Sequence, residues 1–348
     1  MKTIRLLPIF VLLVSILSLI SCDSGSSKST KVRSIGNTSE VLVVMQNDQQ
    51  KDNLIGQEIK KYLGEEQYGL MQNESLFDLA HITVNNFSDM FKKHRNILII
   101  NIDSKAKSTV VESFEDKWSS PQRIIRITSP SEDDFVNDFP EYAEGIITDY
   151  SEAERSRILS VFRPSSKNKV LNEVREAFNL NIIVPQGFYV AKNEPGFMWI
   201  RKEVPDFSQG IVIISEPYVD KEQFSDNSIV ARTNRDLKQY IPGESKGTYM
   251  AITDEFIKPL TKQIENFASE YAIEVRGVWN VEHDFMGGPF VSYTFVDPNN
   301  NQILTIMGYV YHPNKKKRNL LRQLEAIIYS VNFRNPVSDS TKISNKTL

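Results

Sequence analysis

The segment from Trp279 to Tyr293 holds residue types that could bind a ligand or move a proton. A histidine next to a carboxylate, as at His283 and Asp284, can serve as a general base or as half of a metal site. Adjacent strand residues point to opposite faces, so the two side chains need not touch. We interpret the two following glycines as a structural turn, in which glycine permits positive φ. The alternative is that this turn rims a pocket, with Trp279, His283, Asp284, Gly287, Gly288 and Tyr293 at its edge and Tyr309 nearby.

A basic segment lies between the last predicted strand and the last predicted helix. Its asparagine is a good helix N-cap, and four basic residues follow. Basic side chains oppose the partial positive charge of a helix N-terminus, yet together with free backbone N–H groups they can bind an anion. The segment is therefore either a solvated face or a site for phosphate, a lipid headgroup, or an acidic glycan or protein. The residues concerned are Asn314, Lys315, Lys316, Lys317 and Arg318.

One further segment, at 243–247, matches the G-x-S-x-G motif of catalytic serines. In α/β-hydrolases this pattern lies between a strand and a helix. Here a helical segment precedes it and a strand follows, so we predict a loop. The sequence has no P-loop, Rossmann glycine pattern, H-E-x-x-H motif, EF-hand loop or C-x-x-C motif, and we predict no metal and no cofactor. A formal net charge of −3 argues against general nucleic-acid binding, which needs a basic patch.

Cys22 is the single cysteine, so an intramolecular disulfide is excluded. It follows a short basic segment and an apolar run at 6–20. This run is shorter than the roughly 20 residues of a transmembrane helix and is typical of a secretory signal. Leu19–Cys22 resembles the bacterial lipobox, in which the cysteine is acylated. We predict a signal peptide over 1–21, lipidation of Cys22, a flexible tether over 22–35 and a periplasm-facing location, with the inner and the outer membrane both open.

The elements that position these segments fall into two predicted domains, as expected for 348 residues. Over 36–163, apolar runs at 41–45, 97–102 and 123–128 alternate with helical spacing at 54–63, which predicts an α/β domain. In this half we also expect a helix over 105–117 and a helix interruption at Pro140.

Over 164–333, a helix at 169–178 precedes a series of strands. A turn cluster at 297–301 predicts a hairpin between strands 290–296 and 303–311, and an amphipathic helix over 320–331 follows. This order predicts an α+β domain with a mostly antiparallel sheet. Residues 334–348 are polar, and we expect them to form a disordered tail.

Two long motifs resemble the signature of an uncharacterised family of Bacteroidetes lipoproteins. They are Arg276–Trp279 with Val281–Tyr293, and Lys315–Leu320 with Arg322–Ala326. The similarity extends to 241–243 and 36–45, so it covers nearly the whole mature chain. The resemblance implies a lipoprotein of the cell envelope. It implies no activity, because none is established for the family. At the level of fold alone, Ile183–Phe188 leading to 197–199 is similar to PsbP-like domains.

These observations predict a membrane-anchored binding or envelope-scaffold module rather than an enzyme. Its partners are the membrane, through the lipid on Cys22, and an anionic envelope ligand or a protein. The alternative is an envelope hydrolase or transferase that uses acidic residues near the turn from Glu282 to Tyr293. A cleft with several carboxyls of raised pKa favours that enzyme, and an open, largely apolar groove favours the binding module.

Overall fold

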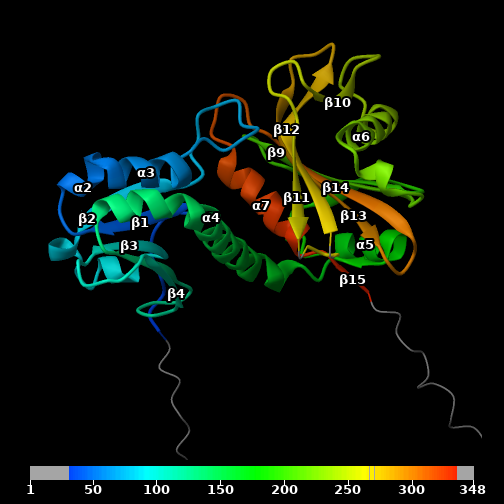
Figure 1. Ribbon diagram of the computed structural model, residues 1–348. Helices are drawn as coiled ribbons and strands as arrows, with labels where there is room; N and C mark the ends of the chain where they lie inside the picture. The colour runs from blue at the N-terminus through cyan, green and yellow to red at the C-terminus, as the bar shows by residue number, and fades with distance from the viewer. Residues whose placement is uncertain (1–30, 266, 270, 335–348) are drawn as a thin grey trace, which may run out of the picture.

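The computed structural model describes residues 31–265, 267–269 and 271–334. The predicted signal peptide, the lipidation site at Cys22 and nearly all of the predicted tail lie outside these residues. Figure 1 shows an α/β unit and a unit with a curled antiparallel sheet, and α4 (Glu132–Phe162) runs from the first toward the second. The predicted fold class is therefore confirmed. No helix of the described chain combines the length and the apolar character needed to cross a membrane.

The N-terminal unit is built on a five-stranded sheet in the order β2-β1-β3-β5-β4. Neighbouring strands are parallel, except that β4 pairs with β5 in the antiparallel sense. The central strands are apolar on both faces because α3 and α4 cover one face and a smaller apolar layer covers the other. The elements are β1 (Glu40–Met45), α2 (Gln49–Asp52), α3 (Leu54–Leu63), β2 (Asp78–Thr83), β3 (Asn96–Ile102), β4 (Val110–Glu115) and β5 (Arg123–Ser129), with short 3-10 turns η1 (Val84–Asn86) and η2 (Phe91–Lys93).

Two predicted elements of this unit are wrong. The helix expected over 105–117 is the edge strand β4, whose side chains are mostly exposed, so its sequence lacks the apolar alternation of a buried strand. The interruption expected at Pro140 does not occur, and α4 continues through it. Pro140 lies on the exposed side of α4, where water can satisfy the unpaired carbonyl, while Phe135 and Phe139 hold the helix on the core.

The first described residues already belong to the folded unit. Arg33 forms a bridge with Ser120, and Ile35 forms one with His94. The backbone N–H of Ile35 donates to the carbonyl oxygen of Lys93 at 2.9 Å. The predicted tether over 22–35 is therefore too long at its C-terminal end.

The C-terminal unit is built on an antiparallel sheet in the order β10-β12-β13-β14-β9-β8-β7, with β11 also paired to β12. α5 and α7 cover one face and α6 covers the other. The predicted hairpin is present as β13 and β14. The elements are η3 (Arg163–Ser165), α5 (Lys169–Phe178), β6 (Leu180–Asn181), β7 (Tyr189–Glu194), β8 (Phe197–Glu203), β9 (Ser208–Pro217), η4 (Lys221–Phe224), α6 (Asp226–Tyr240), β10 (Tyr249–Thr253), β11 (Leu260–Glu265), β12 (Tyr271–Glu282), β13 (Gly287–Asp297), β14 (Gln302–Tyr311), α7 (Arg318–Tyr329) and β15 (Asn332–Phe333).

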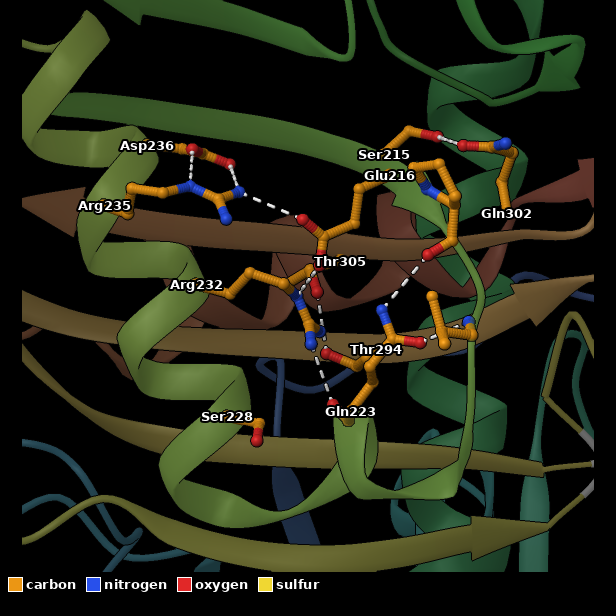
Figure 2. Close-up of polar contacts among 12 residues, drawn as sticks. Ser215, Glu216, Gln223, Ser228, Arg232, Arg235, Asp236, Thr294, Gln302 and Thr305 are labelled. Carbon is orange, nitrogen blue, oxygen red and sulfur yellow. Dashed lines mark hydrogen bonds and ion pairs between the residues drawn. The ribbon is translucent and has the colours of Figure 1, made fainter.

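A polar network fixes α6 on its face of the sheet, as Figure 2 shows. The guanidinium of Arg232 lies 3.0 Å from the carboxylate of Glu216 on β9 and donates to the carbonyl oxygen of Gln223 at 2.9 Å. Arg235 pairs with the same carboxylate at 3.1 Å and with Asp236 at 2.7 Å. Burial lowers the pKa of Arg232, which is 8% exposed. The loop that follows α6 forms one wall of the pocket described next.

Candidate functional site

A pocket of about 470 Å³ opens at one end of the large sheet, on the face that α6 covers. The β8–β9 turn, the loop after α6, the tips of β12 and β13, and the end of β14 meet there. This volume lies within the range of small-molecule sites. Its apolar lining includes Trp199, Met250, Trp279, Met286, Tyr309 and Tyr311.

Hydrogen bonds fix the aromatic floor of this pocket. The indole N–H of Trp199 donates to the hydroxyl of Tyr309 at 2.7 Å, and the indole N–H of Trp279 donates to the carbonyl of Val310 at 3.3 Å. The rings of Trp279 and Tyr309 meet edge to face with centroids 5.0 Å apart. Burial raises the pKa of Tyr309 to about 12, against the opposing effect of the Trp199 hydrogen bond. The phenol is therefore neutral at physiological pH.

Glycines let the aromatic rings lie close to the sheet. A Cβ on Gly210 would lie 2.2 Å from the ring of Tyr309, so only glycine leaves room for that ring. A Cβ on Gly288 would lie 2.1 Å from the carbonyl oxygen of Val310. The prediction that Gly287 and Gly288 form a turn with positive φ is wrong, because both begin β13.

The residue with positive φ in this hairpin is His283, at 66°. Its side chain is exposed and does not line the pocket. The hydroxyl of Tyr293 donates to Glu274 at 2.5 Å on the opposite face of the sheet. Of the predicted rim residues, the structure thus brings only Trp279 and Asp284 to this pocket. Trp199 was not predicted because it lies on β8, about 80 residues before Trp279. Tyr311 follows the predicted Tyr309 by two residues on β14 and was also missed.

Charged side chains surround the aromatic floor. Arg201 pairs with Glu203 on the same strand, and its guanidinium lies 4.5 Å from the centre of the Trp199 ring. Asp206, Glu244 and Asp284 come from three different loops and also line the pocket. Within the described chain, no basic nitrogen lies within 4.0 Å of these three carboxylates. The rim therefore carries a negative charge that the residues described by the structure leave without an ion pair.

The predicted anion site has a different arrangement. Asn314 is not an N-cap but a turn residue with φ of 57°, and α7 begins at Arg318, with Lys317 in the N-cap position. The carboxylate of Glu74, from the N-terminal unit, accepts hydrogen bonds from the backbone N–H of Lys317 at 2.6 Å and of Arg318 at 3.1 Å. The helix terminus thus binds an anion, as helix termini do, but the anion belongs to the same chain.

The side chains of the basic segment take part in the same contact. Arg318 donates to both carboxylate oxygens of Asp78, at 2.7 and 3.1 Å, and these hydrogen bonds lower the pKa of Asp78. Lys317 is buried and donates to Gln72 at 3.1 Å, which leaves Lys315 and Lys316 exposed. Lys317 and Arg318 are thus engaged within the chain, where they join the two units. An anion site at the exposed residues Asn314, Lys315 and Lys316 stays a prediction.

A second ion network lies where α4 meets the large sheet, beside a hollow of about 1080 Å³. Glu325 of α7 pairs with Arg276 at 2.8 Å and with Arg155 of α4 at 3.3 Å. Burial alone would raise the pKa of Glu325, but the two guanidinium groups outweigh it and lower that pKa to about 2. Burial raises the pKa of Glu65 at the edge of this hollow.

The remaining candidate features do not form a site. Ser245 lies exposed in the turn between α6 and β10, where its carbonyl oxygen accepts from the backbone N–H of Thr248 at 3.1 Å. The described residues contain no group of three or more acidic, histidine or cysteine side chains that could hold a metal ion.

Comparison with known proteins matches each unit to a separate domain model. Residues 34–163 match a domain of unknown function (DUF8532), and residues 166–330 match another (DUF4837). No curated protein matches the chain. The crystal structure of LpqN, described as involved in cell envelope biogenesis of Mycobacterium tuberculosis, is similar over 44% of this chain and 82% of LpqN, with 12% identity and a TM-score of 0.27. That likeness is too weak to assign a fold or a function. The chain is thus similar to two uncharacterised domains, one in each structural unit.

Proposed function

We propose that the protein is a lipid-anchored binding module of the cell envelope and that the aromatic pocket is its binding site. The observation that carries this proposal is the floor of Trp199, Trp279 and Tyr309, which hydrogen bonds and buried packing hold in place without a ligand. A floor that is already ordered loses little conformational entropy when a ligand arrives. Its apolar surface and few polar groups are typical of binding sites.

The location of the pocket suits an anchored molecule. Figure 1 places the first described residues and the pocket end of β12 on opposite sides of the molecule. Cys22 lies nine residues before Lys31, which at full extension spans roughly 30 Å. A lipid on Cys22 would therefore tether the molecule through its N-terminal unit, on the side away from the pocket end of β12.

The anchor is tested by replacing Cys22 with Ser. We expect the variant to lose acyl labelling and to leave the membrane fraction, because the thiol is the acylation site. Acyl labelling and fractionation of parent and variant cells measure both effects. Membrane association of the unlabelled variant at the level of the parent would contradict the anchor.

The pocket is tested by photo-crosslinking in native membranes, with the crosslinking residue placed at Val204 on the pocket rim. The matched control carries it at Val219, which is exposed but does not line the pocket. We expect a discrete adduct from position 204 and none from position 219. The same adducts from both positions, or none from position 204, would contradict binding in this pocket.

A further inference from the structure

We propose that the pocket recognises an organic cation, meaning an ammonium or guanidinium group carried on an apolar body. This inference rests on the proposed function and specifies the chemistry of its ligand. It depends on two independent features of the pocket, the unpaired acidic rim and the aromatic floor.

The rim carries negative charge that no basic residue of the described part of the chain neutralises. Asp206, Glu244 and Asp284 extend from the β8–β9 turn, the α6–β10 loop and the β12–β13 tip. Arg201 is the basic residue among the lining side chains, and Glu203 already pairs with it. Three carboxylates around one opening give it a negative potential. That potential favours a bound cation over a bound anion.

The floor supplies the surface that organic cations prefer. Electron-rich faces of Trp and Tyr attract ammonium and guanidinium groups within about 6 Å of the ring centre. The chain itself shows this contact at the pocket, where the guanidinium of Arg201 lies 4.5 Å from the ring centre of Trp199. Trp279 and Tyr309, which are 3% and 5% exposed, and the half-buried Tyr311 complete the aromatic lining. The apolar part of the ligand would contact Met250 and Met286, which are flexible enough to fit varied shapes.

A metal cation fits these residues less well than an organic cation. The described residues hold no cluster of three or more potential metal ligands, and hard cations need several oxygen ligands at short range. Aromatic rings add nothing to such a site, whereas they are the recurring partners of quaternary ammonium groups.

The test uses the full chain with Cys22→Ser, so that it can be studied without membrane, and measures binding by titration calorimetry. The cationic probes are choline and arginine amide, and the neutral probe is 3,3-dimethylbutan-1-ol, which has the shape of choline without its charge. The cation could belong to a small molecule or to a basic side chain of a peptide. A peptide with one arginine is therefore compared with arginine amide to distinguish these two sources. We expect choline to bind at least about tenfold more tightly than its neutral analogue, and more weakly as salt rises.

A pocket variant and a matched control separate rim charge from overall charge. The pocket variant carries Asp206→Asn, Glu244→Gln and Asp284→Asn. The control carries Asp133→Asn, Glu141→Gln and Glu176→Gln, which are exposed acidic residues without an ion pair in the described chain. We expect the pocket variant to bind choline at least about fivefold more weakly, since each exposed ion pair contributes modestly, and the control to bind like the parent. Thermal unfolding verifies that both variants remain folded.

Three results would overturn the inference. Equal affinity for choline and its neutral analogue would show a pocket that binds without selecting charge, and would leave the proposed binding function in place. Equal weakening in the pocket variant and the control would assign the effect to overall charge. Failure of every cationic probe to bind at roughly 10 mM would also refute cation recognition, while the adduct from position 204 tests the binding function separately.

Discussion

Replacing Glu74 with Ala should strongly destabilise the contact between the two units. Glu74 is 5% exposed, and its carboxylate accepts the backbone N–H groups of Lys317 and Arg318 at 2.6 and 3.1 Å. In the Ala variant both donors lose their partner, and the N-terminus of α7 loses the negative charge beside it. Water can replace the carboxylate only poorly at this buried position, so the loss should appear in the free energy of unfolding.

The expected loss of unfolding free energy has two contributions, which are not fully additive. Hydrogen bonds to a charged group contribute about 1.5–3 kcal/mol, and a carboxylate at a helix N-terminus contributes about 0.3–1 kcal/mol more. We expect Glu74→Ala to lower the free energy of unfolding by about 3 kcal/mol. Glu74→Gln keeps one oxygen acceptor and loses the charge, so about half of that loss should remain.

Urea denaturation followed by circular dichroism measures the effect. The matched control is Glu66→Ala, an exposed glutamate in the same loop with no side-chain hydrogen bond in the described chain. Since Glu74 belongs to one unit and α7 to the other, Glu74→Ala should also separate the unfolding of the two units into distinct transitions. A loss within about 0.5 kcal/mol of the control, in a single transition, would refute the assignment of Glu74 as the anion bound by α7.

Two further changes test the ion networks. The pKa of Glu325 falls from 4.5 to about 2 on folding, so its ionic contribution to stability, about 3 kcal/mol, is present above pH 4.5 and fades as the pH falls toward 2. Glu325→Gln should therefore reduce the loss of unfolding free energy between pH 4.5 and pH 2, and an unchanged loss would contradict the network. Glu216→Gln should lower the free energy of unfolding by about 2 kcal/mol, because it removes the carboxylate partner of the buried Arg232. The control Glu194→Gln, in an exposed pair, should lower it by under about 0.5 kcal/mol. Equal losses in the two variants would refute the role of the α6 network.

Local sequence patterns predicted those elements whose stability is local. The helices over 54–63 and 169–178 have the predicted bounds because a buried stripe at helical spacing coincides with an asparagine cap at each start. The fold class could also be predicted from the sequence. Strands of a parallel sheet covered on both faces are continuously apolar, whereas strands of an antiparallel sheet commonly alternate apolar and polar residues. β4 was missed because an exposed edge strand needs no apolar period, and Pro140 was misjudged because tertiary packing outweighs the loss of one hydrogen bond.

Contacts between distant segments could not be predicted in this way. The basic segment before α7 was predicted to be either a solvated face or an anion site, and nothing local shows that Glu74, more than 200 residues away in sequence, accepts a hydrogen bond from its backbone. In the same way, Asp284 and Trp279 are near each other in the chain, whereas Trp199 reaches the pocket only because β8 pairs with β9 and β9 pairs with β14. Side-chain alternation could have excluded Tyr293 from the predicted pocket rim. Tyr293 lies on the face of the sheet opposite to Phe290 and the pocket.

The central claim is that the aromatic pocket holds a ligand, and native mass spectrometry of protein extracted from its own membranes tests it most directly. The parent is compared with a variant carrying Trp199→Ala and Tyr311→Ala, and with Tyr218→Ala, which removes an aromatic side chain from a different hollow. The account predicts a bound mass on the parent and on the Tyr218→Ala protein that the pocket variant lacks. The same bound mass on all three proteins, or none on the parent, would contradict it.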